Sequence, residues 1–246
     1  MLTSHRHTNR AGFQNYTAAP AITTTVLPSN VSYNDGVVVP VAFNAAMYGL
    51  HDTNGFGLQA PSLQPQQSDK TVVIYGGSSS VGAMAIQLAV ASGAKVIATA
   101  SSHNFDFVKK AGAAEVFDYK SSSVIDDVAS AVKSAGGDFV GVFDTISTPD
   151  TFKISVPMLE YLGGGVLITV LPGAPELPSN IKLNNIHGYG PVIFPFWDSY
   201  ITKALEGGHL KCLPPPSVVG KGVESFQKAL DESRKGVSAR KLIVEI

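Results

Sequence analysis

Residues 70–88 read KTVVIYGGSSSVGAMAIQL, and this stretch decides the fold of the chain. Residues 71–75 are apolar and rich in β-branched side chains, which predicts a strand buried on both faces. Glycines and serines occupy positions 76–80, and after Val81 and Gly82 apolar residues recur at helical spacing through Leu88. A strand, a tight glycine turn and a helix form the first half of a mononucleotide-binding unit.

The residue types in this turn suit a pyrophosphate. We expect Gly77 to adopt a backbone conformation closed to residues with a Cβ, Ser79 to let a pyrophosphate approach the main chain, and Gly82 to let the helix pack closely on the strand. The free N–H groups and the dipole of the helix favour an anion at its start. An ordinary Ser- and Gly-rich connection is the alternative. The predicted phosphate-binding residues are Gly77, Ser78, Ser79, Ser80, Val81 and Gly82.

The composition is that of a globular protein with no basic or acidic bias. Net charge is −1, which argues against a nucleic-acid or anionic-membrane partner. No apolar run is long enough to span a membrane, and the start MLTSHRHTNR lacks a hydrophobic signal core, so we expect a cytoplasmic protein. Cys212 is the only cysteine, which excludes an internal disulfide and a cysteine-cluster zinc site. We expect no metal, and interpret His5 and His7 as solvated side chains.

From residue 70 onward, strand and helix patterns alternate. This alternation predicts an α/β fold with a doubly wound parallel sheet of the Rossmann type, six strands wide, whose ligand crevice lies beyond the carboxyl ends of the strands. Thr148 is expected to cap the helix that begins at Pro149. The expected strands are 71–75, 95–100, 115–118, 139–144, 165–171 and 181–187, and the other helices here are 80–92, 104–111 and 124–134.

The two ends of the chain are less regular. We expect a frayed segment over 1–11, a strand over 12–18, an extended segment over 20–28, a helix over 37–51 and a linker over 52–69. Near the other end, Phe194, Phe196, Trp197 and Tyr200 form an aromatic cluster, which we interpret as core in preference to a substrate pocket. Residues 214–216 are expected to stop a helix. The remaining expected elements are helices 197–205 and 223–233 and a closing strand 241–246.

The segment after the second strand indicates the cofactor. NAD-binding units usually place a carboxylate there for the ribose 2′-hydroxyl, but here none occurs before Asp106. Ser101, Ser102 and His103 suit a 2′-phosphate better, with Lys109 as the charge partner. The sequence therefore favours NADPH over NADH. Alternatively, Ser102 caps the next helix, a role compatible with phosphate binding.

Three segments resemble a known family. GGSSSVGAMAIQLA (76–89), SSHNFDFVKKAGAAEVFDY (101–119) and GVSARKLIVEI (236–246) resemble the medium-chain dehydrogenase/reductase superfamily, in particular its zinc-free quinone oxidoreductases and fungal trans-acting enoyl reductases. The resemblance covers residues 12–246. It implies that Ser101, Lys109 and Tyr119 meet the 2′-phosphate. It also implies that residues 144–147, with Asp144 and Ile146, and residues 168–171, with Leu171, lie beside the nicotinamide.

The chain departs from this family at three places. Members begin with a GroES-like barrel, and this chain starts near the end of that domain. Ala45 stands where members have a threonine near the nicotinamide, with Asn44 beside it as a weak substitute. The segment 187–197 is short for a substrate loop. We expect a remnant of the barrel plus linker over 1–66, an NADP-binding Rossmann domain over 67–190, and C-terminal helices and a strand over 191–246 that pack back on the remnant. Unpaired strand edges would then favour a homo-oligomer or a stable partner.

Three functions remain open. The resemblance implies an NADPH-dependent reductase of an activated C=C bond, in an enoyl thioester or a quinone-like substrate, acting in polyketide biosynthesis beside a polyketide synthase. Tyr48 is the candidate proton donor, although a helix tyrosine is more often structural. The second hypothesis is a redox-silent member that binds an apolar, free or carrier-bound polyketide chain and guides a cyclisation or isomerisation. The third is a non-catalytic nucleotide- or partner-binding protein.

Overall fold

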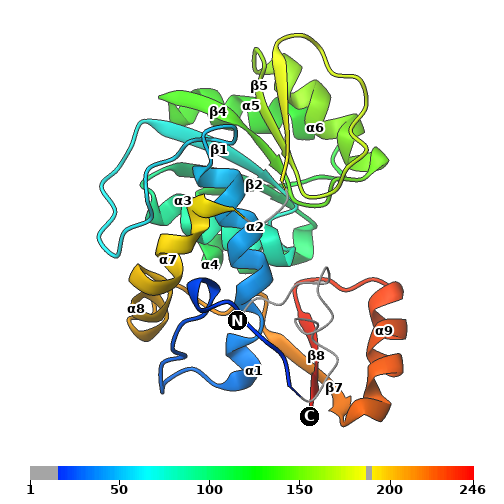
Figure 1. Ribbon diagram of the computed structural model, residues 1–246. Helices are drawn as coiled ribbons and strands as arrows, with labels where there is room; N and C mark the ends of the chain where they lie inside the picture. Colours follow the sequence, from blue (N-terminus) through cyan, green and yellow to red (C-terminus); the bar gives the residue numbers. More distant parts are fainter. Residues whose placement is uncertain (1–15, 187–189) are drawn as a thin grey trace.

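A six-stranded parallel sheet forms the centre of the computed structural model, which describes residues 16–186 and 190–246 (Figure 1). Its strand order is β3-β2-β1-β4-β5-β6, and each neighbouring pair runs parallel. The predicted doubly wound sheet is therefore confirmed, with its topological switch point between β1 and β4. The strands are β1 (Lys70–Tyr75), β2 (Lys95–Ala100), β3 (Glu115–Asp118), β4 (Asp138–Asp144), β5 (Gly165–Thr169) and β6 (Ile181–Asn185).

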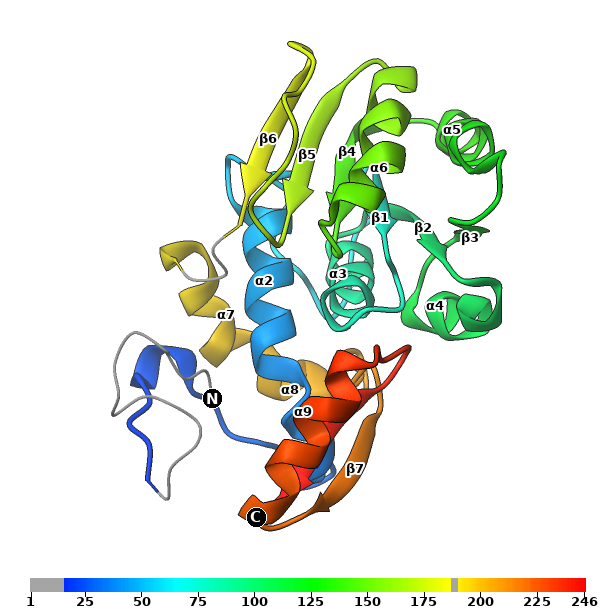
Figure 2. The same ribbon diagram turned by 90° about the vertical axis from the view of Figure 1, so that its right-hand side faces the viewer.

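Helices cover both faces of the sheet (Figure 2). Along β1, Val72 and Ile74 belong to the hydrophobic cluster on one face, whereas Val73 and Tyr75 belong to the cluster on the other. Burial on both faces explains why this strand is apolar without alternation. The first cluster includes side chains of α2 (Val39–His51), α3 (Ser80–Ala91) and α4 (Phe105–Ala111), and the second includes α5 (Val124–Ala135) and α6 (Pro149–Tyr161).

Local signals predicted the ends of these elements well. Thr148 caps α6 in a capping box with Thr151, and Pro149 stands in the first turn, as expected. Pro40 likewise lies in the first turn of α2. The fifth and sixth strands are two residues shorter than predicted, and His187 lies outside the described residues. No helix in the described parts of the chain has the length and apolarity that a membrane crossing requires.

The aromatic cluster is mainly core, which confirms its interpretation. Trp197 and Tyr200 are buried, and the Trp197 indole donates a hydrogen bond to Oδ1 of Asn44 at 2.9 Å. The predicted single helix over 197–205 is wrong, because it is two short helices, α7 (Phe194–Ser199) and α8 (Ile201–Glu206). Tyr200 separates them with a φ of −119°, far from the α-helical value.

A small β-α-β unit at the C-terminal end stands apart from the main sheet (Figure 1). It consists of β7 (Pro216–Lys221), α9 (Phe226–Arg234) and β8 (Lys241–Glu245), and β7 pairs with β8 in parallel. The sequence patterns did not predict β7, because a proline run precedes it and its partner strand begins twenty residues after its end. A 3-10 turn (Val223–Ser225) precedes α9, where we expected the helix itself to begin.

The N-terminal part differs from our expectation. The strand predicted over 12–18 lies partly outside the described residues, and residues 16–19 are irregular. A 3-10 turn (Ala21–Thr23) interrupts the predicted extended segment, and a short helix α1 (Tyr33–Gly36) precedes α2. Hydrogen bonds join this segment to the C-terminal part, for example Asn34 Nδ2 to Glu245 Oε1 at 2.8 Å. The division into three domains stays a prediction. His5 and His7 lie outside the described residues.

Trp197→Phe should lower the free energy of unfolding by about 2 kcal/mol, because it leaves the buried Oδ1 of Asn44 without its donor. The Nδ2 of Asn44 already lacks a partner among the described residues. Urea titration of Trp197→Phe, Asn44→Ala and the double variant measures the coupling. Asn44→Ala should cost less in the Trp197→Phe background than in the wild type. Fully additive costs would contradict the assigned bond.

Candidate nucleotide-binding site

The turn after β1 depends on three glycines, of which Gly82 has the predicted role and Gly77 does not. The positive φ, +82°, belongs to Gly76 and not to Gly77, so the expectation for Gly77 is wrong in this respect. A Cβ on Gly77 would instead lie 3.0 Å from side-chain atoms of Ile86 and Val108. A Cβ on Gly82 would lie 2.3 Å from the carbonyl oxygen of Gly76. Gly82 therefore permits the close approach of α3 to the end of β1.

The hydroxyl of Ser79 is used entirely within the protein. Its oxygen accepts a hydrogen bond from the Gly82 N–H at 2.9 Å, which makes Ser79 the N-cap of α3. It also lies 2.9 Å from Oγ1 of Thr145, which donates to the carbonyl oxygen of Tyr75 at 2.8 Å. A hydroxyl has one proton, so Ser79 must be the donor to Thr145. The hydroxyls of Ser78 and Ser80 bond to no described residue and stay available to a ligand.

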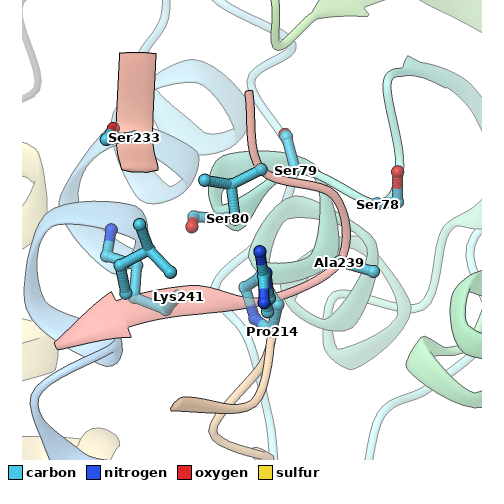
Figure 3. A pocket seen from close by; sticks show the side chains of 10 residues that line it. Ser78, Ser79, Ser80, Pro214, Ser233, Ala239 and Lys241 are labelled. Carbon is cyan, nitrogen blue, oxygen red and sulfur yellow. The ribbon is translucent and has the colours of Figure 1, made fainter. Parts of the chain in front are cut away.

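A cavity of about 290 Å³ lies in front of this turn (Figure 3). The serines at 78–80 line one side, and the chain that leads into β8 through Ala239 lines the other. This second wall contains Arg240 and Lys241. Neither cation forms an ion pair with a described residue. Partial burial lowers the pKa of Lys241 from its ordinary value.

The residues that line the cavity favour an anionic ligand. Two basic side chains without a carboxylate partner face a helix start whose first N–H groups have no intrahelical acceptor. An anionic ligand would compensate the partly buried ammonium of Lys241. Sequence reasoning missed Arg240 and Lys241 as site residues. These two basic residues are adjacent near the end of the chain, about 160 positions after the glycine turn, and no local sequence pattern indicates that they lie beside it.

The residues predicted to meet a 2′-phosphate lie after β2 and β3. Ser101 donates a hydrogen bond to the hydroxyl of Tyr119 at 3.2 Å, so these two are brought together. Lys109 is exposed on α4, and no interaction joins it to either of them in the described structure. Lys120 is a second cation nearby, with Nζ 5.8 Å from the centroid of the Tyr119 ring. Ser102 begins a 3-10 turn (Ser102–Asn104), and its side chain caps no helix, so that alternative is wrong.

The carboxylate of Asp144 has a structural role at the end of β4. It is fully buried, and Oδ1 accepts hydrogen bonds from the N–H groups of Ile146 (3.0 Å) and Ser147 (2.8 Å), while Oδ2 accepts one from Ser155 (3.2 Å). These bonds support the φ of +58° at Ser147. Ile146 and Leu171, the other two residues predicted beside a nicotinamide, present partly exposed apolar side chains after β4 and β5.

Tyr48 does not line the cavity that contains Arg240 and Lys241. Its ring packs against Gly190, where an added Cβ would come within 2.9 Å of Cε2, and its hydroxyl bonds to no described residue. Asn44 is 1% exposed, and its carbonyl oxygen accepts the Trp197 hydrogen bond. The Nδ2 of Asn44 has no partner among the described residues, and the hypothesis that Asn44 replaces the family threonine stays a prediction. Residues 16–186 and 190–246 contain no group of three His, Cys, Asp or Glu side chains placed to hold a metal.

Known proteins are similar to this chain over most of its length. A family model described as zinc-binding dehydrogenase matches residues 80–198. Dehydrogenase orsE of Emericella nidulans is 43% identical over 244 residues, which cover 94% of this chain and 70% of that protein. Trans-enoyl reductase himH of Aspergillus japonicus is 38% identical over 247 residues, which cover 98% and 70%.

Solved structures share the fold. The crystal structure of CurK enoyl reductase has a TM-score of 0.66 at 18% identity and covers 90% of this chain, which spans 65% of that one. CurA from Vibrio vulnificus, solved in complex with NADPH, has a TM-score of 0.62 at 20% identity, with coverage of 91% and 67%. The chain thus spans about two thirds of these structures and 70% of the two fungal proteins.

Ser79→Gly should leave dinucleotide affinity within about twofold and cost a few tenths of a kcal/mol, because glycine is itself an acceptable N-cap. Ser79→Ala should cost about 1 kcal/mol, since it removes the cap and retains a Cβ. Urea unfolding and dinucleotide titration of both variants give the two quantities. A tenfold loss of affinity in Ser79→Gly would mean that the hydroxyl contacts the ligand instead of Thr145.

Proposed function

The chain belongs to the medium-chain dehydrogenase/reductase superfamily of oxidoreductases, and from this premise we propose that it uses NADPH to reduce an activated C=C bond of an enoyl thioester or a quinone-like substrate. The observation that carries the proposal is the anion-binding cavity at the start of α3. It has unpaired Arg240 and Lys241 on one side and free serine hydroxyls on the other. The names of relatives support the reaction, since himH is a trans-enoyl reductase.

The residues around the cavity fit a pyrophosphate. The N–H groups at the start of α3 and the hydroxyls of Ser78 and Ser80 would donate hydrogen bonds to its oxygens. Arg240 and Lys241 would compensate its charge from the opposite wall. The absence of a carboxylate among the lining residues supports the same assignment, because nothing there would repel the ligand.

The choice of NADPH over NADH rests on the ends of β2 and β3. The first acidic residue after β2 is Asp106, on the exposed side of α4, so no carboxylate holds the position that an NAD ribose requires. Ser101 and Tyr119 form a hydrogen-bonded pair, with Lys120 over the tyrosine ring, and Lys109 lies on the following helix. Two hydroxyls with cations around them suit a phosphate dianion. The NADPH complex of CurA supports the same cofactor.

The proposed chemistry divides hydride and proton between two partners. NADPH, when bound, supplies a hydride to the β-carbon of the alkene. The α-carbon then takes a proton, and Tyr48 is the proposed donor because its hydroxyl has no hydrogen-bond partner among the described residues. Ile146 and Leu171 would keep the nicotinamide side apolar and limit access of water. The substrate is proposed to be an apolar, carrier-bound chain from a polyketide synthase.

An assembly with another chain is part of the proposal. The stretch 26–41, which leads through α1 into the first turn of α2, contains four exposed apolar residues: Val26, Tyr33, Val37 and Val41. Exposed apolar side chains in one region mark interaction surfaces. We propose a homo-oligomer or a stable complex with the partner that delivers the substrate.

Lys241→Met and Arg240→Gln should each weaken NADPH binding by about 10- to 100-fold, since each removes a charged contact to the pyrophosphate. Lys235→Met, an exposed lysine that does not line the cavity, is the matched control and should leave the dissociation constant unchanged. Fluorescence titration with NADPH and NADH measures all four proteins, and the wild type should prefer NADPH. Preference of the wild type for NADH, or unchanged affinity in both variants, would contradict this assignment.

The same titration at rising pH gives a second readout. An anionic ligand favours the protonated form of Lys241, so the pKa of this lysine is higher in the complex than in the free protein. Affinity is therefore full below the free-state pKa, which burial lowers from the ordinary 10.5, and falls as pH rises through that value. In Lys241→Met, this fall of affinity with rising pH should be absent.

NADPH oxidation with a panel of enoyl thioesters and quinones tests turnover. Tyr48→Phe should lower kcat at least tenfold and leave the dissociation constant of NADPH unchanged, because only the proposed proton donor is lost. Tyr161→Phe, on the opposite face of the sheet, is the control. Tight NADPH binding with no turnover of any substrate would instead favour the redox-silent alternative.

A further inference from the structure

Asn104 forms an unusual long-range contact. It stands at the N-cap of α4, where an asparagine side chain ordinarily accepts a bond from the first turn of the helix, yet it forms no such cap. Its Nδ2 instead donates to Oγ of Ser238 at 2.9 Å, 134 positions along the chain. Asn104 is 6% exposed, so this bond satisfies a buried polar group. The side chain serves a tertiary contact in place of the local one.

Ser238 lies in the segment between α9 and β8, two residues before Arg240. Most of residues 235–240 are exposed, and their other hydrogen bonds are the turns from Lys235 to Glu232 and from Gly236 to Ser233. Among the described residues, the bond to Asn104 is thus the only hydrogen bond that joins residues 235–240 to the Rossmann domain. The next residue, Ala239, has a φ of +49°, a conformation that needs support from its surroundings.

The route of this segment places a cation at the cavity. The chain runs from Ser238 through Ala239 to Arg240 and Lys241, and these last three residues line the cavity opposite the serines of the α3 start (Figure 3). Lys241 belongs to β8, so its position is set by the strand pairing. Arg240 precedes the strand and lacks an ion-pair partner among the described residues. The position of Arg240 over the glycine turn therefore depends on the contacts that fix residues 235–240.

We propose that the Asn104–Ser238 hydrogen bond is a latch that positions Arg240 over the phosphate-binding turn. Asn104 and Ser238 are then positioning residues for the dinucleotide and do not contact it. Asn104 is the last residue of the 3-10 turn that follows Ser101. The same loop would therefore contact the 2′-phosphate through Ser101 and position Arg240 at the pyrophosphate through the bond from Asn104 to Ser238. This inference rests on the proposed function, because it assigns Arg240 to a pyrophosphate.

The test is a double-variant cycle with NADPH. Ser238→Ala should weaken NADPH binding about fivefold, the value expected when one hydrogen bond that places a charge is lost. In the Arg240→Gln background the same change should have no further effect, because the group that it positions is gone. Ser238→Thr, which keeps the hydroxyl, should restore affinity. Ser217→Ala, a serine of β7 with no side-chain bond to a described residue, is the control and should bind as the wild type does.

A second readout needs no cofactor. Trypsin cleaves after Lys235 and Arg240, and release of the latch should speed cleavage at these two bonds several-fold in Ser238→Ala and Asn104→Ala relative to Ser217→Ala. Thermal unfolding of the variants shows whether the fold is retained. If the hydrogen bond were only structural, Ser238→Ala would lower the melting temperature, and its effect on NADPH affinity would be the same with and without Arg240→Gln.

The outcomes separate the latch from the proposed function. If the wild type fails to bind NADPH while cleavage still responds to Ser238→Ala, the cofactor assignment is wrong and with it the role of Arg240. If the wild type binds NADPH and Ser238→Ala equals it in both affinity and cleavage, the latch is wrong and the proposed function stands. Additive effects of Ser238→Ala and Arg240→Gln would also overturn the latch.

Discussion

The close approach of α3 to the end of β1 is the constraint on which the site depends. Only 2.3 Å separates the carbonyl oxygen of Gly76 from the place where a Cβ on Gly82 would stand, so the helix begins directly against the turn. That contact aims the unpaired N–H groups of the helix at the cavity. The Ser79 hydroxyl donates to the Thr145 hydroxyl, which donates to the backbone carbonyl oxygen of Tyr75, and these bonds join the ends of β1 and β4 at the switch point of the sheet. The packing of backbone groups thus gives this end of the sheet a surface that favours an anion.

The second half of the site comes from the far end of the chain. The small β7-α9-β8 unit brings two cations to a helix start that already favours anions. Net charge is only −1, so this attraction is local and does not arise from the field of the whole molecule. Burial makes the pairing stronger, because Lys241 is partly removed from water and finds no carboxylate among the described residues. The cavity thus lies between the Rossmann domain and the β7-α9-β8 unit.

Three buried polar side chains of this protein make internal hydrogen bonds that hold loops or helices in place. Asp144 resembles a ligand contact in sequence, but its oxygens accept hydrogen bonds from the loop that follows β4 and from Ser155 of α6. Asn44 binds the Trp197 indole, and Asn104 binds Ser238. In each case a buried polar atom without a partner would destabilise the fold, and an internal bond satisfies it. The pyrophosphate contacts and the proton transfer are proposed for groups without a partner among the described residues, on Ser78, Ser80, Tyr48, Arg240 and Lys241.

The sequence by itself determined the architecture and the position of the phosphate turn. Apolar runs, glycines and the Thr148–Pro149 start signal are local features, so the six strands and the helices between them followed from neighbouring residues. The tertiary structure alone decided what lies opposite that turn. The pairing of β7 with β8, the path of Arg240 to the α3 start and the partner of Asn104 join residues that are 24 to more than 130 positions apart. Propensity and periodicity describe a chain over a few turns, whereas these contacts depend on which surfaces meet once the core is packed, and no local pattern records that.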